Sequence, residues 1–138
     1  MSRLSLLHQE GALRSYFPGC EIFREGESVL TWIHALQPSP LSDTYRVKLH
    51  YSKGQVKAYV LTPKLKLAEG ERKLPHVYST ERQQLCLYYP EKREWHAGML
   101  FVQTIIPWMS EWLYFYEIWL CCGKWLGGGI EHSGAEPK

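Results

Sequence analysis

The sequence predicts an α+β domain in which an N-terminal helix, an antiparallel β-meander of about four strands, a long ordered loop and a C-terminal helix follow one another. Three observations lead to this prediction. Hydrophobic residues alternate strictly from Tyr45 to Tyr51, as in a half-exposed antiparallel strand. Aromatic residues recur at helical spacing between Thr104 and Cys122. Between these two segments, residues 68–95 are rich in apolar side chains but show no sustained period.

The N-terminal helix is expected over residues 3–16. Leu4, Leu7 and Leu13 fall near one helical face there, which is the pattern of an amphipathic helix. The pair Pro18-Gly19 is expected to end it, because proline and glycine interrupt regular structure.

Three strand signals follow. They are the β-branched and aromatic run at residues 29–38, the alternating run at residues 45–51 and a less regular run at residues 55–63. Residues 38–43 connect the first two runs, and a short turn at residues 52–54 connects the last two. These short connections favour neighbouring antiparallel strands, and so they predict a meander.

Residues 68–95 are expected to form a long ordered loop. A connection of this length inside a compact domain is usually either functional or disordered. Its leucines, tyrosines and Trp95 favour a segment that packs on the domain. Ordered loops of this kind often hold chemically active residues.

The C-terminal helix is expected to begin at Gly98 or Thr104 and to run to Cys122. Pro107 suits its first turn, and Gly123 suits the position just after its last turn. An aromatic stripe on this helix is expected to pack onto the sheet and consists of Trp108, Trp112, Phe115 and Trp119.

The apolar character of the same segment raises the question of a membrane span. Glu111 and Glu117 interrupt it, and each would cost roughly 3 kcal/mol at the centre of a bilayer. Pro107 also lies within it. A buried amphipathic helix without membrane contact is therefore expected, with Cys121 and Cys122 as core residues at its end.

The composition is that of one soluble globular domain. The 138 residues are 45% hydrophobic and 22% charged, and the formal net charge is +2. The basic residues are scattered, which argues against nucleic-acid binding, since that function usually needs a concentrated basic face. Residues 1–132 are predicted to form the domain, and residues 133–138 a flexible tail.

Four cysteines are expected to be free thiols: Cys20, Cys86, Cys121 and Cys122. The first residues lack the apolar segment of a secretory signal, which predicts a cytoplasmic protein with reduced thiols.

Cys86 raises the main question about function. It stands between Leu85 and Leu87 in the stretch LPHVYSTERQQLCLYYP and follows His76 by ten residues. A free cysteine is often a buried and inert hydrophobic residue. It can also carry an acyl group, because a thiol is nucleophilic near neutral pH and its thioester stays reactive toward amines.

An acyl carrier needs an exposed sulfur and donors that stabilise the developing oxyanion. Cys86 lies on a segment where both are feasible. The candidate supporting groups are His76, Tyr78 and the backbone N–H groups near Cys86. His76 is expected to shape the loop by hydrogen bonding rather than to act as a general base.

Metal binding is the remaining alternative for Cys86. Structural zinc sites normally use closely spaced pairs such as Cys-x2-Cys, which the sequence lacks. No metal and no cofactor is therefore predicted. The residues that a metal site would have to draw on are His76, Cys86, His96, Cys121, Cys122 and His132.

The glycine-rich stretch Gly127–Gly129 is a weaker signal. It matches neither a phosphate loop nor a dinucleotide fingerprint, because no strand precedes it. A tight turn, or a surface that a partner's backbone can approach, is the simpler interpretation. Glu131 and His132 follow it and could face the cysteine.

The order of elements and the residues around Cys86 resemble the ubiquitin-conjugating enzyme (UBC) fold over roughly residues 1–122. Pro63 follows the last strand, His76 opens the triplet HVY, and Cys86 lies ten residues later in LCL. In that family a histidine opens a His-Pro-Asn motif, and the acceptor cysteine follows ten residues later in a hydrophobic-Cys-Leu tripeptide. Trp95 stands where the family often carries tryptophan.

One departure from the family concerns the asparagine of that motif, which is thought to support the oxyanion and the active-site loop. His76-Val77-Tyr78 replaces His-Pro-Asn here. The resemblance therefore implies either that Tyr78 substitutes as a hydroxyl donor or that transfer to a lysine is slow.

The C-terminal part resembles the divergent bacterial branch of the family. The stretches HVY…LCLYYP, TIIPWMSEWLYFYEIWL and GKWLGGGIEH carry this resemblance. Stand-alone members of that branch are encoded in CBASS antiphage operons beside a cGAS-like nucleotidyltransferase. The resemblance implies that Cys86 forms a thioester with the C-terminal glycine of this partner and controls its conjugation or release. No phosphate loop is visible in the sequence, so activation would come from another protein, or the reaction would start from an already activated or conjugated substrate.

Two other functions stay open at this point. A non-catalytic UBC-like module would hold a partner's C-terminal tail, which the missing asparagine favours, and its binding would survive replacement of Cys86. A cysteine isopeptidase would act through Cys86 and His76, and it would cleave a preformed conjugate without ATP.

Overall fold

The computed structural model describes residues 3–127 and confirms the predicted α+β class. The strands form one antiparallel sheet in the order β1-β2-β3-β4-β6-β5, so the sheet has six strands rather than about four. Along the chain the elements are α1 (Leu6–Tyr16), β1 (Glu21–Glu25), β2 (Val29–Leu36), β3 (Tyr45–Ser52), β4 (Gln55–Thr62), β5 (Val77–Ser79), β6 (Gln84–Leu85), the 3-10 helices η1 (Pro90–Lys92) and η2 (Phe101–Gln103), and α2 (Ile105–Cys122).

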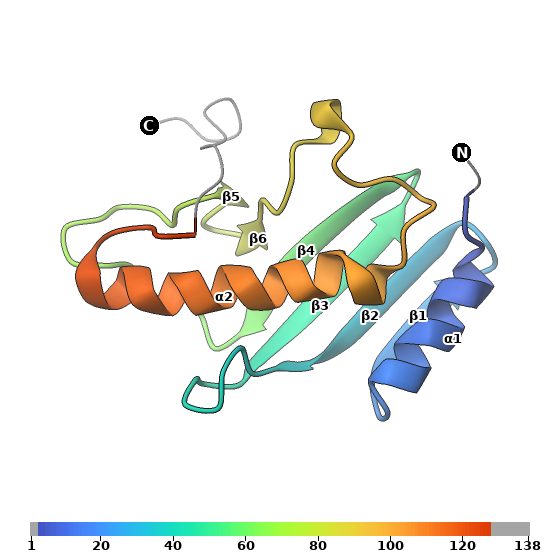
Figure 1. Ribbon diagram of the computed structural model, residues 1–138, viewed down its shortest axis with the longest axis horizontal. Coiled ribbons are helices and arrows are strands. Elements are labelled where there is room, and N and C mark those ends of the chain that lie inside the picture. The colour runs from blue at the N-terminus through green and yellow to red at the C-terminus, as the bar shows by residue number, and fades with distance from the viewer. Residues whose placement is uncertain (1–2, 128–138) are drawn as a thin grey trace.

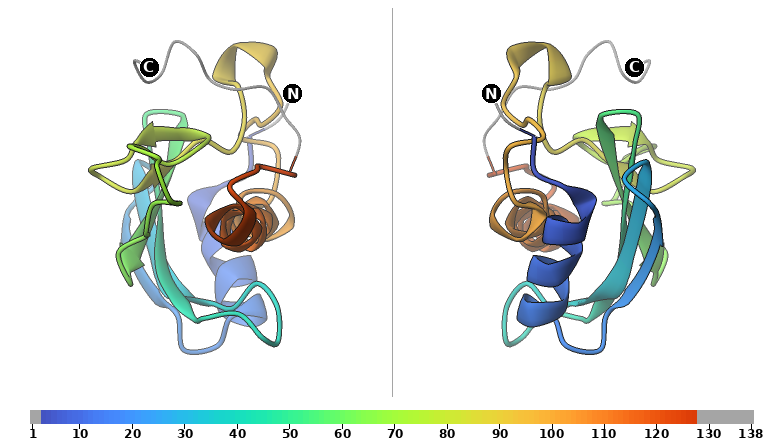
Figure 2. Two further views of the ribbon diagram at one scale, coloured as in Figure 1. Left: turned by 90° about the vertical axis from the view of Figure 1, so that its left-hand side faces the viewer. Right: turned by 90° about the vertical axis from the view of Figure 1, so that its right-hand side faces the viewer.

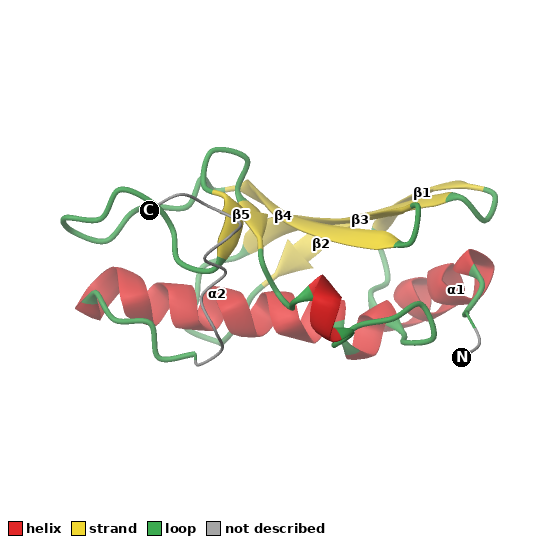
Figure 3. Ribbon diagram, turned by 90° about the horizontal axis from the view of Figure 1, so that it is seen from above, coloured by secondary structure: helices red, strands yellow, loops and turns green. Residues whose placement is uncertain are grey.

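The elements form two layers, with α1 and α2 on the same face of the sheet (Figures 1, 2 and 3). The core lies between the layers. On β3 the side chains of Tyr45, Val47, Leu49 and Tyr51 are buried, as their alternation predicted. Burying a side chain of this size stabilises the fold by roughly 1.5–3 kcal/mol relative to exposure. Within residues 3–127, no helix is both long and apolar enough to cross a bilayer.

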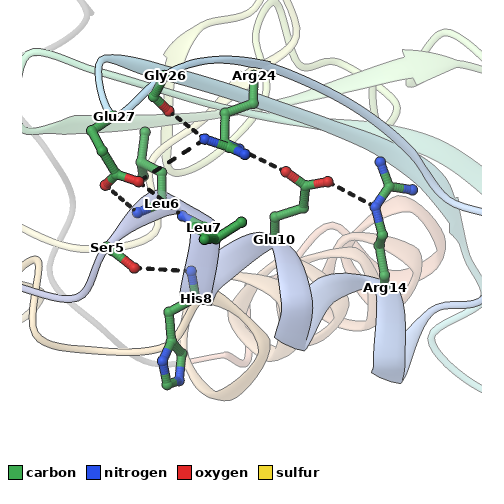
Figure 4. Close-up of polar contacts among 9 residues, drawn as sticks. All are labelled: Ser5, Leu6, Leu7, His8, Glu10, Arg14, Arg24, Gly26 and Glu27. Carbon is green, nitrogen blue, oxygen red and sulfur yellow. Dashed lines mark hydrogen bonds and ion pairs between the residues drawn. The ribbon is translucent and has the colours of Figure 1, made fainter.

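The N-terminus of α1 is capped by two side chains (Figure 4). The Ser5 hydroxyl accepts a hydrogen bond from the His8 amide at 3.0 Å, and the Glu27 carboxylate accepts from the amides of Leu6 at 2.6 Å and Leu7 at 3.1 Å. The Leu6 amide is the main reason that the pKa of Glu27 lies below its usual value. A carboxylate at this position also interacts favourably with the helix dipole.

Ion pairs connect α1 to β1. Glu10 accepts from Arg24 at 2.7 Å and from Arg14 at 2.9 Å, and both bonds lower the pKa of Glu10 (Figure 4). These side chains are partly exposed, so each pair contributes at most about 1 kcal/mol to stability. The Glu10–Arg24 pair joins α1 to β1, whereas the Glu10–Arg14 pair lies within α1.

The buried face of α1 differs from the predicted one. Leu6, Gln9 and Leu13 are buried, whereas Leu7 is exposed, so the grouping of Leu7 with Leu13 is wrong. Residues three or four positions apart share a helical face, which holds for Leu6, Gln9 and Leu13 but not for Leu7 and Leu13.

Three strands have no counterpart among the predicted ones. β1 is an edge strand with mostly exposed side chains, so it shows no alternation of polar and apolar residues. β5 and β6 have three and two residues, which is too short for a period to appear. Both lie within the segment that was expected to be a loop.

The structure confirms the predicted C-terminal helix as α2. The predicted burial of Cys121 and Cys122 at its end is wrong. Pro107 lies in the first turn, and Gly123 ends the helix in the left-handed conformation with φ 76°. The Gly123 amide donates to the Trp119 carbonyl at 2.7 Å, as in a glycine-capped helix end. Cys121 and Cys122 are exposed instead of lying in the core, because the last turn extends past the edge of the sheet (Figure 1).

Candidate active site at Cys86

Cys86 directly follows the short hairpin of β5 and β6. Val77 pairs with Leu85 in this hairpin, and the Cys86 amide donates to the His76 carbonyl at 3.0 Å. His76 directly precedes β5 and Cys86 directly follows β6, so their hydrogen bond joins the two ends of the hairpin. This pairing is the structural reason for the ten-residue spacing in the sequence.

The carbonyl oxygen of His76 accepts a second hydrogen bond, from the indole Nε1 of Trp112 at 3.0 Å. Trp112 belongs to α2 and is 4% exposed. His76 itself has φ 49°, a conformation uncommon outside glycine, and its ring packs 5.1 Å from the Trp125 ring. The backbone of His76 thus holds the hairpin against α2.

The Cys86 sulfur is half-buried and lies between two tyrosines. The Tyr78 phenol hydrogen-bonds to the sulfur, and the thiol can donate to the Tyr88 carbonyl at 3.8 Å. The Tyr78 hydroxyl also lies 3.4 Å from the Tyr88 carbonyl, so its single proton can go either to that carbonyl or to the sulfur. Tyr78 is therefore positioned to donate to a thiolate or to an oxyanion formed beside the sulfur.

Burial raises the pKa of the Cys86 thiol above its ordinary value. The hydrogen bonds with Tyr78 and Tyr88 oppose this shift, and the carboxylates of Glu94 and Glu91 add to it. The thiol is consequently protonated near neutral pH. It lacks the depressed pKa of a strongly activated catalytic cysteine.

We expect alkylation of Cys86 by iodoacetamide to accelerate with pH around a midpoint above that of a free thiol, because only the thiolate reacts. The folded chain binds this proton more tightly than the unfolded chain. Cys86 therefore adds stability below the unfolded pKa, and this stability is lost as pH rises through the folded pKa. Mass spectrometry of the Cys86 peptide would give the profile. A midpoint at or below that of the same peptide free in solution would contradict the burial argument.

The Tyr78→Phe variant is expected to alkylate several-fold more slowly at neutral pH, since it removes a hydrogen bond that favours the thiolate. The rate would be measured on the Cys86 peptide by mass spectrometry. Tyr114→Phe is the matched control, because Tyr114 is exposed on α2. Equal rates in wild type and Tyr78→Phe would show that this bond has no influence on the sulfur.

A groove of about 400 Å³ opens beside Cys86. Residues 86–89 form one wall, and Trp108 and Phe115 of α2 contribute to the opposite wall. Trp125 and Gly127 also line it, because the chain turns back after α2. A Cβ on Gly127 would lie 2.8 Å from the Phe115 ring, so glycine permits this close approach.

Charged side chains lie along the same groove: Lys92, Glu94 and Glu111. The Glu94 carboxylate accepts from the Tyr89 amide at 2.7 Å and so orders the segment after Cys86. The amides of Cys86 and Tyr89 are thus both bonded within the protein and are not open to an oxyanion. The Tyr78 hydroxyl is the supporting donor that the structure places against the sulfur.

Of the residues considered for a metal site, His76 lines the same groove as Cys86, whereas His96, Cys121 and Cys122 lie elsewhere. His96 lines a separate cavity, and Cys121 and Cys122 lie exposed at the end of α2. Among residues 3–127, no three histidine, cysteine or acidic side chains are placed to hold a metal ion. Gly128, Gly129, Glu131 and His132, together with the predicted tail at 133–138, lie outside the described residues.

The helical wall of the groove is the part that sequence reasoning missed. Trp112 and Trp119 are buried as expected, but Trp108 and Phe115 are half-buried and line the groove. Glu111 lies between them on the helix. An acidic residue within an aromatic stripe was the available signal that this face is not wholly covered by the sheet.

A helix, a meander, a short hairpin followed directly by a cysteine, and a second helix that lines the groove beside that cysteine together give the arrangement of an E2-like, ubiquitin-conjugating-type protein. The comparison with known families is more specific. The family model described as type II CBASS E2 protein matches residues 9–133, and the chain belongs to this family. It is thus an E2-like protein of CBASS antiphage defence, as the resemblance implied. A search of curated proteins found no match.

Proposed function

We propose that Cys86 carries an acyl group as a thioester with the C-terminal glycine of a partner protein, and that the partner is a cGAS-like nucleotidyltransferase. The protein would then control conjugation or release of that partner. The observation that supports this most directly is a half-buried sulfur that lines an open groove and is hydrogen-bonded to Tyr78.

The shape of the groove suits an extended tail that ends in glycine. Its opposite wall includes the bulky rings of Trp108 and Phe115, and Trp125 lines it as well. A glycine terminus can bring its carbonyl carbon close to a half-buried sulfur because it has no side chain to clash with these rings. The aromatic rings supply apolar surface for the preceding residues of the tail.

In the proposed step the Cys86 sulfur attacks the carbonyl carbon of a glycine that is already activated as a thioester or an adenylate. The new C–S bond forms, and the bond to the leaving thiolate or AMP breaks with its electron pair. The thiol proton passes to solvent or to the leaving thiolate. Tyr78 would donate to the negative charge that develops beside the sulfur.

The raised pKa of Cys86 suits a carrier. A thiol with a high pKa leaves more slowly than one with a low pKa, so its thioester resists premature displacement. Partial burial by Tyr78 and Tyr88 would also limit attack by water.

The experiment uses the C-terminal peptide of the nucleotidyltransferase, prepared as a glycyl thioester. Incubation with the protein is expected to give an adduct by intact mass, sensitive to hydroxylamine and to thiol, and peptide mapping is expected to place it on Cys86. The same peptide ending in an alanyl thioester should react more slowly. An adduct confined to the exposed Cys121 or Cys122 would contradict the proposal.

The second candidate is a non-catalytic module that holds the tail without a covalent bond. The amides of Cys86 and Tyr89 favour it, because both are bonded within the protein and leave few donors for an oxyanion. This function predicts that the free peptide acid binds with equal affinity to wild type and to Cys86→Ala, with no adduct from the thioester. The isopeptidase function gains no such support, since a cysteine hydrolase uses an activated thiolate.

A further inference from the structure

The groove beside Cys86 carries an excess of negative charge. Glu94 and Glu111 line it, and Lys92 is the only lysine or arginine among the described residues in its lining. The Lys92 ammonium lies 5.0 Å from the centre of the Tyr89 ring, on the wall that follows the cysteine. A groove with this charge balance favours a ligand that brings a positive charge.

The two carboxylates of the groove differ in what they already bind. Glu94 accepts a hydrogen bond from the Tyr89 amide at 2.7 Å. Glu111 is exposed, and none of the hydrogen bonds or ion pairs found among residues 3–127 uses its side chain. The Glu111 carboxylate is therefore available to a bound ligand.

Aromatic residues flank Glu111 on the helical wall. Trp108 lies three positions before it and Phe115 four positions after it on α2, so the three residues share one face of the helix. All three line the groove. The face of an aromatic ring attracts cations, and a guanidinium can stack on a ring while it pairs with a carboxylate. This combination suits the side chain of arginine.

We infer that the tail held in this groove carries an arginine shortly before its terminal glycine, and that Glu111 recognises this arginine together with Trp108 and Phe115. The inference rests on the proposed function, since it takes the groove to be the place where the tail binds. Glu111 is then a specificity-determining residue. It selects the tail and takes no part in the attack on the glycine carbonyl.

The test uses peptides of the form Ala-Ala-Ala-Ala-Gly with a fluorophore at the N-terminus. Arginine replaces each alanine in turn, and citrulline, its neutral analogue, does so in a matched set. At one of these positions we expect wild type to bind the arginine peptide about five- to tenfold more tightly than the citrulline peptide, as measured by fluorescence anisotropy. This preference should shrink as salt is added, because exposed charges are screened.

The Glu111→Gln variant is expected to bring the ratio of the two affinities close to one. Glu91→Gln is the matched control, because it removes the same charge from the segment after Cys86 but Glu91 does not line the groove. Glu91→Gln should keep the preference for arginine. Glu111→Arg should instead favour a peptide with glutamate at the same position.

Three results would overturn the inference: no preference for arginine at any position in wild type, a preference that survives Glu111→Gln, or an equal loss in Glu91→Gln. The same peptides prepared as glycyl thioesters test the carrier function separately. An adduct on Cys86 without any preference for arginine would refute the inference and leave the carrier function standing. Preferential binding of arginine peptides without an adduct would refute the carrier function and support the recognition by Glu111.

Discussion

Replacement of Cys86 by alanine is expected to abolish the adduct with a glycyl thioester peptide. The sulfur is the atom to which the acyl group would be attached, and no neighbouring side chain can substitute for it. The variant is also expected to stay folded, because Cys86 is half-buried and its amide bond to His76 does not involve the side chain. Intact mass would measure the adduct, and circular dichroism would check the fold.

The Cys86→Ser variant tests whether the acyl group is attached at position 86. An oxyester is less reactive than a thioester, so any adduct on serine should survive free thiol. Cys121→Ser/Cys122→Ser is the matched control, because it removes two exposed thiols from the end of α2 and should leave the adduct intact. Persistence of the adduct in Cys86→Ala would refute the carrier function.

Replacement of Gln9 by methionine is expected to destabilise the fold by about 2–5 kcal/mol. Gln9 is 2% exposed on α1. Its Nε2 donates to the Met99 carbonyl at 2.9 Å, and its Oε1 accepts from the Phe101 amide at 3.0 Å. Methionine has a similar volume but would leave the buried Phe101 amide and the part-buried Met99 carbonyl unsatisfied, each at a cost of about 1–3 kcal/mol.

Chemical denaturation would measure this loss as a change in the free energy of unfolding. Gln103→Met is the matched control, because Gln103 is exposed and a surface change of this kind usually alters stability by less than about 0.5 kcal/mol. Equal effects of the two substitutions would mean that Gln9 does not tie α1 to the segment before α2.

The periodic parts of the fold could be predicted from the sequence because a buried face repeats along them. The alternation from Tyr45 to Tyr51 and the glycine after α2 each reflect a local rule that the structure obeys. β1 could not be predicted this way, since an exposed edge strand has no buried face. β5 and β6 depend on pairing with residues distant in the chain, and such contacts leave no local period.

In the candidate site, too, some features can be predicted from the local sequence and others depend on contacts between distant residues. The spacing of His76 and Cys86 is visible in the sequence because a hairpin joins them. The Trp112 bond to His76 spans 36 positions and depends on how α2 packs, which periodicity does not report. The burial that raises the pKa of Cys86 is likewise a property of the assembled fold.

One carbonyl oxygen, that of His76, receives the N–H groups of both Cys86 and Trp112. These two hydrogen bonds hold β6 and α2 to the same carbonyl. The distance between the two walls of the groove would therefore be fixed before the proposed peptide tail binds. Docking then requires little ordering of the protein and loses little conformational entropy. Such preorganisation would let a short and weakly held peptide stay long enough to react.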